Sequence, residues 1–206
     1  MLAANKMANE ELLKAIAELE NDTGVKEGFF AGLLVEDDWS FIIKIHALYE
    51  AAVSNLITNK IGQVKLEGFI SRLELSDKSK GKLKLAKDLN LLDDQERKFI
   101  YSLSEIRNSF VHNVKNTQVD LEKYLDNLDE NKRQNYIDTF GYTYPENITI
   151  AGKTINSKIF TRENPRIAIW HNSIHVLAVI SCLTSTERKN KSIQQLILKI
   201  HELQNR

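Results

Sequence analysis

The sequence has few of the residues that interrupt regular structure, with two prolines and eight glycines among 206 residues. Average proteins contain about 5% proline and about 7% glycine, and folds with many hairpins use both residues at their turns. Their scarcity disfavours a turn-rich β-fold and favours long helices. Both prolines lie within residues 141–166, so we expect this tract to be irregular.

The chain has one cysteine, Cys182. One thiol cannot form an internal disulfide, and it excludes a cysteine-based zinc cage. Cys182 lies within an apolar run, which predicts a small residue of the core rather than a reactive thiol.

Long uninterrupted apolar runs are also missing. The N-terminal segment lacks the apolar core of a signal peptide. The longest apolar stretch, residues 167–183, is interrupted by two histidines, an asparagine and a serine, and it is short for a membrane span. We therefore expect a soluble, cytoplasmic protein with no membrane partner.

Neither sign of charge is in excess, because 28 lysines and arginines balance 28 aspartates and glutamates. Zero net charge excludes the simplest electrostatic case for a nucleic-acid coat or a binder of anionic membranes, but it leaves room for a local basic groove. With 42% hydrophobic and 27% charged residues, the composition is that of a globular protein. The length fits a single domain, 1–206.

Apolar residues recur at intervals of three and four along most of the chain, which is the period of an amphipathic helix. The pattern predicts helices over residues 8–19, 39–60, 79–89, 93–113, 119–128, 132–140, 166–183 and 191–201, with a weaker helical pattern over 66–75 and a short apolar connector at 28–34. Asp37 or Asp38 is expected to cap the second helix, and Asp93 with Glu96 resembles a capping box.

These elements predict an all-α domain of about six to eight helices. Its core is expected at about 29–140, followed by an irregular insertion at 141–166 and by C-terminal helices at 166–204. A turn at residues 151–153 predicts a small hairpin inside the insertion.

Among the five histidines, His112 has the most informative neighbours, because Arg107 and Asn108 precede it on one predicted helix. Cleavage of a phosphodiester without a metal needs a permanent cation to hold the phosphate and a group that exchanges a proton near neutral pH. Five positions turn a helix by about 500°, so the side chains of Arg107 and His112 are expected about 140° apart. Two copies of the helix in a symmetric dimer would supply two arginines and two histidines to one cleft. The alternative is structural, since an arginine and a histidine near a helix end are common.

Secondary candidates come from other helices. His46 and Glu50 are four positions apart, so they could form a buried structural pair or orient a functional histidine. The lysine-rich helix at 79–89 is expected to turn its lysines outward, either as a solvated face or as an RNA-binding surface. The RNA-binding candidates are Lys80, Lys82, Lys84 and Lys87.

His171 and His175 have a spacing that could hold a metal ion. No nearby acid completes a ligand set, so we favour a role in helix packing. The sequence therefore predicts neither a metal nor a cofactor.

The segment Ile-Arg-Asn-Ser-Phe-Val-His at 106–112 resembles the R-x4–6-H motif of the HEPN superfamily. Together with the segments at 37–50 and 83–92, it also resembles the MltR family of mannitol operon repressor-like proteins, over about residues 29–115. The six-residue motif alone has low specificity, and its order after the upstream helix makes the resemblance more specific. The insertion at 141–166 has no counterpart in either family.

The resemblance implies a HEPN-like helical bundle that forms a homodimer. It implies a metal-independent endoribonuclease with Arg107 and His112 catalytic and Asn108 orienting them, acting in a toxin or antiphage system and leaving a 2′,3′-cyclic phosphate. RNA would then be the substrate, and a protein partner or antitoxin is expected. The alternative implied by the MltR-like branch is a non-enzymatic regulator that acts through protein contacts.

Overall fold

The structure, a computed structural model, describes residues 2–112 and 120–204. The described elements, in chain order, are α1 (Leu2–Thr23), α2 (Phe29–Leu33), α3 (Asp38–Ile61), a 3₁₀ turn (Val64–Leu66), α4 (Glu67–Arg72), α5 (Lys82–Asp88), α6 (Asp94–His112), α7 (Leu121–Asp126), α8 (Glu130–Phe140), β1 (Asn147–Ile150), β2 (Lys153–Asn156), α9 (Ser157–Glu163) and α10 (Pro165–Gln204). In this part of the chain, ten α-helices accompany one two-stranded sheet, which confirms the all-α fold class.

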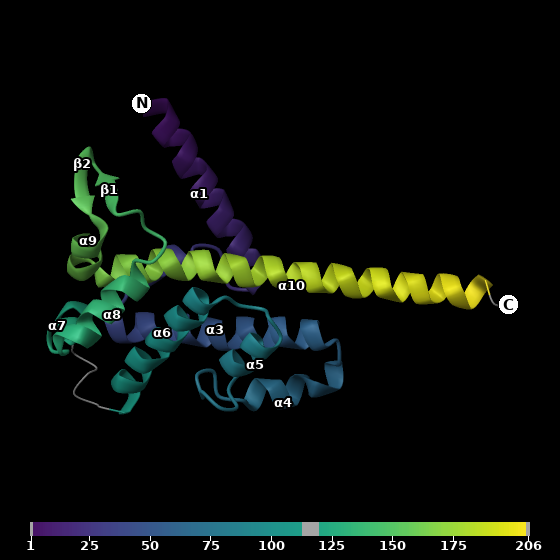
Figure 1. Ribbon diagram of the computed structural model, residues 1–206. Coiled ribbons are helices and arrows are strands. Elements are labelled where there is room, and N and C mark those ends of the chain that lie inside the picture. Colours follow the sequence, from purple (N-terminus) through teal and green to yellow (C-terminus); the bar gives the residue numbers. More distant parts are fainter. Residues whose placement is uncertain (1, 113–119, 205–206) are drawn as a thin grey trace.

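Two long helices, α3 and α10, form the axis of the fold and lie side by side (Figure 1). They run in the same direction. At their first turns, Nε of Arg166 donates to the carboxylate of Asp38 at 2.6 Å, and near the end of α3 the ammonium of Lys60 pairs with Glu187 at 2.8 Å. The helices α4, α5 and α6 pack on α3, whereas α1, α8 and α9 pack on α10.

The core is centred on aromatic rings from α3, α6 and α8. Tyr49, Phe99 and Phe140 are fully buried, and their rings meet edge to face at centroid distances of 6.1 and 5.7 Å. The first half of α10 enters the same core through residues that include Ile169 and Ile180. The hydrophobic core therefore also includes residues of α10, because this helix packs along α3.

Several predicted helix boundaries are confirmed by their caps. The carboxylate of Asp37 accepts the backbone N–H of Ser40 at 2.8 Å, so Asp37 is the N-cap of α3. Gly62 ends that helix with a φ of 72°, a left-handed conformation that glycine adopts without strain. Asp93 and Glu96 exchange two hydrogen bonds of 2.8 Å, which is the predicted capping box at the start of α6.

The predicted hairpin is also confirmed, with Asn147 opposite Asn156 and Ile150 opposite Lys153. Its two turn residues, Ala151 and Gly152, both have positive φ, at 50° and 80°. Two such residues form the tight turn that matches the twist of paired strands. The insertion is more regular than expected, because the hairpin leads directly into α9, whose first N–H groups are capped by the Asn156 side chain.

Other boundaries were wrong. The helix expected at 8–19 is longer, the connector at 28–34 contains α2, and the helix expected at 79–89 begins only at residue 82. The expected helices at 166–183 and 191–201 are one continuous helix, α10, because residues 184–190 contain polar residues but no glycine or proline. The predicted boundaries at Asn113 and Val119 lie outside the described residues.

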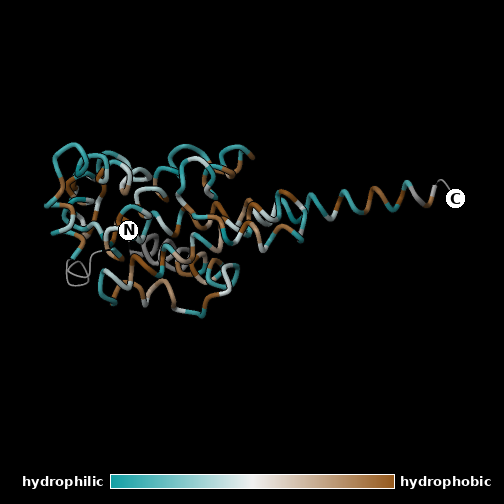
Figure 2. Tube along the Cα trace, turned by 90° about the horizontal axis from the view of Figure 1, so that it is seen from below, coloured by the Kyte–Doolittle hydropathy of each residue, from teal (hydrophilic) through white to brown (hydrophobic). Residues whose placement is uncertain are grey.

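The last part of α10 leaves the body of the molecule. In two views at right angles, the helix continues past the end of α3 with no neighbouring element (Figures 1 and 2). The segment Pro165–His201 of α10 is long enough to span a membrane, and its most apolar 18 residues have a mean hydropathy of 1.5. Of these 18 residues, 44% are buried in the fold. This is weak evidence for a span, since core helices of soluble proteins share these properties.

Candidate functional site

The exposed side of α6 carries most of the predicted site. Positions 101, 105, 108 and 112 lie within about 60° of one another around the helix axis. Asn108 and His112 are exposed, and Tyr101 is half-buried. We call Tyr101, Glu105, Asn108 and His112 the α6 outer face.

Arg107 is half-buried and lies beside this face rather than on it. Its Nη1 donates to Oδ1 of Asn108 at 3.0 Å. This hydrogen bond holds the guanidinium toward the side of the helix that Asn108 and His112 share. Asn108 therefore contacts Arg107 directly, and its role in orienting catalytic groups stays a prediction.

His46 lies on α3, behind α6, and it is buried. Its Nε2 is 3.2 Å from Oγ of Ser104, and that hydroxyl donates to the carbonyl of Ile100. The hydrogen-bond partner of His46 is therefore Ser104, and not Glu50.

Charges from three elements nevertheless act on His46. Burial lowers its pKa below 6.5, and the carboxylate of Glu50 opposes this shift. The positive charges of Arg107 and Lys82 lower the pKa further. The fold therefore brings His46, Glu50, Lys82 and Arg107 into one electrostatic neighbourhood at the junction of α3, α5 and α6.

The four lysines predicted to bind RNA do not share one surface. Lys80 is exposed in the loop before α5, and Lys84 and Lys87 lie on the solvent side of the helix. Lys82 was predicted to face outward, and this was wrong: its side chain is only 3% exposed. Positions 82 and 86 are four apart and share a face, so Lys82 packs inward beside the buried Ala86.

Lys84 and Lys87 line a groove of about 500 Å³ between α5 and α6. Lys78 and Lys98 also line it, together with Tyr101 and Glu105 of the α6 outer face. Among the described residues, Lys78, Lys87 and Lys98 have no ion-pair partner within 4 Å. We call this the basic groove, although the sequence as a whole has no net charge.

The acidic groups of the basic groove are already engaged. Asp94 pairs with Arg97, and the carboxylate of Glu105 accepts a hydrogen bond from the Tyr136 hydroxyl at 3.0 Å. The groove therefore presents free ammonium groups beside a half-buried tyrosine ring. That combination suits a nucleic-acid backbone with a base stacked on the ring.

Other hollows were missed by the sequence analysis, and two of them lie along α3. One, of about 470 Å³, lies between α3 and α4 and is lined by Glu50, Ser54, Glu67, Ser71 and Lys82. Burial lowers the pKa of Lys82 there, and the charge of Glu50 opposes that shift. Its residues come from three helices, so no local sequence pattern could have indicated it.

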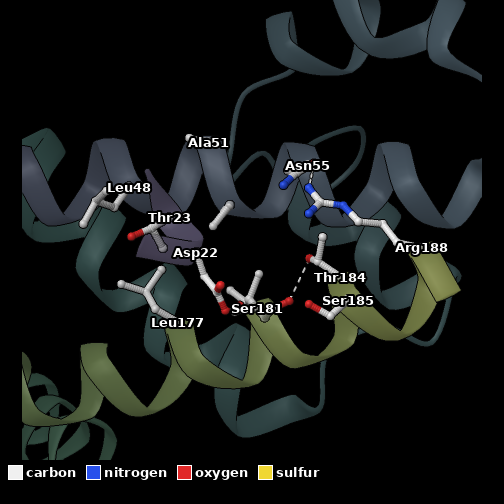
Figure 3. A pocket seen from close by; sticks show the side chains of 12 residues that line it. Asp22, Thr23, Leu48, Ala51, Asn55, Leu177, Ser181, Thr184, Ser185 and Arg188 are labelled. Carbon is white, nitrogen blue, oxygen red and sulfur yellow. Dashed lines mark hydrogen bonds between the residues drawn. The ribbon is translucent and has the colours of Figure 1, made fainter. Parts of the chain in front are cut away.

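The other hollow, of about 220 Å³, lies between the end of α1, α3 and α10 (Figure 3). Figure 3 shows Asp22 and Ser181 close together and Arg188 directed toward Asn55. None of the residues predicted for RNA cleavage lines this hollow.

The remaining candidates pack against aromatic rings or face solvent. His171 lies 4.9 Å from the ring of Tyr144, and His175 lies 6.3 Å from that of Tyr142. In the part of the chain that the structure describes, no cluster of three metal-ligating side chains is found. Cys182 is exposed on α10, so its prediction as a core residue was wrong.

No family model, curated protein or solved structure matches this chain.

Proposed function

We propose that this protein is a metal-independent endoribonuclease whose α6 outer face holds and cleaves RNA. The observation that supports the proposal best is the hydrogen bond from Arg107 to Asn108. It directs a permanent cation toward the face that carries the exposed His112. The basic groove reaches the same face through Tyr101 and Glu105, which offers the RNA backbone a path to these residues.

The proposed reaction is attack of a ribose 2′-oxygen on the adjacent phosphorus. The new 2′-O–P bond forms as the P–O5′ bond breaks, which leaves a 2′,3′-cyclic phosphate and a free 5′-hydroxyl. One group must accept the 2′-hydroxyl proton and another must protonate the departing 5′-oxygen. Arg107 would hold the phosphate oxygens and offset the charge that develops on them.

One chain supplies one histidine to this face, whereas the reaction needs both a base and an acid. A symmetric pair of α6 outer faces would provide His112 from each protomer. The proposal therefore includes a homodimer. By resemblance to the HEPN superfamily, it extends to an effector in a toxin or antiphage system with a protein antitoxin.

Cleavage of total RNA and tRNA by the purified protein in EDTA tests the proposal. We expect wild-type protein to cleave RNA and to leave cyclic-phosphate ends. Arg107→Ala and His112→Ala should each lower the rate by about 10²-fold or more, because each removes a group that acts on the reacting phosphate. Asn108→Ala should have a smaller effect of the same sign, since it frees the guanidinium without removing it.

Matched controls come from exposed residues of the same type. Arg188 and His201 are exposed residues of α10, outside the α6 outer face. The variants Arg188→Ala and His201→Ala should both cleave RNA at the wild-type rate. Cleavage that requires a metal ion, or that survives in both Arg107→Ala and His112→Ala, would overturn the proposal.

A second candidate is a non-enzymatic regulator that acts through protein contacts. The observation that favours it is the exposed apolar surface at the end of α10, where Leu196, Leu198 and Leu203 are each more than half exposed. Apolar surfaces of this kind mark contacts with partners. A well-folded wild-type protein that binds RNA no better than its Arg107→Ala variant and cleaves none would support this candidate.

A further inference from the structure

We propose that the end of α10 pairs with the same segment of a second copy in a parallel, two-stranded coiled coil. We call residues 192–204 the α10 tail. The proposal is independent of the nuclease function, because the α10 tail and the α6 outer face lie on different parts of the molecule (Figure 1).

The α10 tail begins where contact with the body ends. Among the described residues, the last hydrogen bond from α10 to another element runs from the ammonium of Lys191 to the carbonyl of Gly62, the residue that ends α3. Beyond it, every tail side chain that the structure describes is exposed. The tail continues a helix that the body has already nucleated, but it gains nothing from packing on the body, and most helical stability in proteins comes from such packing. A partner helix would supply it.

The apolar residues of the α10 tail follow the heptad repeat of a coiled coil. Ile193 and Ile200 occupy the first position of successive heptads, and Leu196 and Leu203 occupy the fourth. All four are between 45% and 71% exposed. We call these four residues the seam.

The seam points away from the body. Leu196 and Ile200 lie about 160° around the helix from Ile180, which is buried against the core. No element of the described chain lies on that side of the α10 tail (Figures 1 and 2). A partner helix could therefore reach the seam without displacing any part of the fold.

The residue types indicate which partner covers the seam. Isoleucine at the first heptad position with leucine at the fourth favours two parallel strands. A second copy supplies the same pattern in the same register, and a twofold axis then closes the pair. Two heptads form a smaller contact than a standard interface of about 800 Å² per partner, so we expect a dimer that dissociates on dilution.

The first experiment measures mass in solution over a range of protein concentrations. The mass of the wild-type particle in solution should double in one step as the protein concentration rises. The double variant Leu196→Glu, Ile200→Glu should lack that step, because two charges would be buried in the seam. Leu198→Glu is the matched control, since Leu198 lies on the same helix but outside the seam, and it should associate like wild type.

The second experiment tests the direction of the strands by oxidative cross-linking. In a Cys182→Ser background, Leu196→Cys should form a disulfide-linked dimer, because equal positions face each other in a parallel pair. Leu198→Cys should not. In an antiparallel pair Leu196 would face Ile200 of the other copy, so cross-linking only in a mixture of Leu196→Cys and Ile200→Cys would overturn the parallel arrangement.

Two further results would overturn pairing altogether. One is a wild-type mass that does not depend on concentration and equals that of the double variant. The other is seam-dependent flotation with vesicles of phosphatidylcholine and phosphatidylglycerol by protein whose mass in solution does not change with the seam substitutions, which would identify a lipid surface as the occupant.

Discussion

The two halves of α10 have the same backbone conformation and opposite surroundings. In the first half, Val176, Leu177 and Ile180 are at most 1% exposed and pack in the core. In the α10 tail, equally apolar residues face solvent. The helical backbone is compatible with buried and with exposed apolar residues. The elements that lie next to each half therefore decide whether its apolar residues are buried.

The difference indicates two separate tasks for one helix. The first half stabilises the fold, because its apolar residues are removed from water by α3 and its neighbours. The α10 tail contributes little to the folded monomer and is available for association. Three pairs of substitutions can break or sharpen this comparison.

Shortening a leucine in each half should give the largest difference in the free energy of unfolding. Leu177→Ala should lower the free energy of unfolding by about 3–5 kcal/mol, because it leaves a cavity in a packed region. Leu198→Ala, on the α10 tail outside the seam, should change it by less than about 0.5 kcal/mol. Urea unfolding of both variants measures the difference, and similar losses would contradict the division of α10.

Removing an arginine from each half should give the next largest difference in the free energy of unfolding. Arg166 contacts Asp38 and the carbonyls of Leu34 and Glu36, and its guanidinium lies 5.6 Å from the ring of Phe41. Arg166→Ala should lower the free energy of unfolding by about 2 kcal/mol, because the largely covered carboxylate of Asp38 loses a charged hydrogen-bond donor.

The matched variant is Arg188→Ala, near the point where α10 leaves the body. Arg188 is exposed and has one hydrogen bond of 3.4 Å, to Asn55. Its loss should change the free energy of unfolding by less than about 0.5 kcal/mol. Thermal or urea unfolding is the measurement, and equal losses for the two arginines would rule out the anchoring role of Arg166.

The smallest contrast concerns pH. Burial, together with the charge of His175, lowers the pKa of His171 below 6.5. As the pH falls through 6.5, the unfolded chain takes up a proton at this site before the folded chain does. The contribution of neutral His171 to the free energy of unfolding is therefore complete above that pH and is lost below it. Unfolding measured between about pH 7.5 and about pH 5.5 should therefore show a steeper loss in wild type than in His171→Gln.

His201→Gln is the control for that measurement, because His201 lies on the exposed α10 tail. It should leave the pH dependence of unfolding at the wild-type slope. A wild-type slope in His171→Gln as well would mean that burial of His171 has no effect on stability.

Local features of the fold were predictable from the sequence. Asp37, Gly62 and the Asp93–Glu96 pair act through residues a few positions away, so their effects on the backbone are visible in a short segment. The Ala151-Gly152 turn is a similar case. The continuity of α10 was also indicated by the absence of glycine and proline, although the polar segment was interpreted as a break.

The candidate site was only partly predictable. Helix geometry alone indicates that Asn108 and His112 share a face, whereas the contact of Arg107 with Asn108 depends on a side-chain conformation. The inward position of Lys82 could have been inferred from its spacing to Ala86. The contact of His46 with Ser104 could not, because 58 positions separate the two residues.

The sequence by itself determined most of the helices, several of their caps, the hairpin turn and the heptad pattern of the α10 tail, because these depend on residues within about one or two helical turns of one another. Only the tertiary structure decided that His46 contacts Ser104, that Cys182 is exposed, and that a basic groove forms on a chain of zero net charge. It also decided that one half of α10 is covered and the other is not. The physical reason is that burial and local charge depend on which helices become neighbours, and that choice is made by packing across the whole chain.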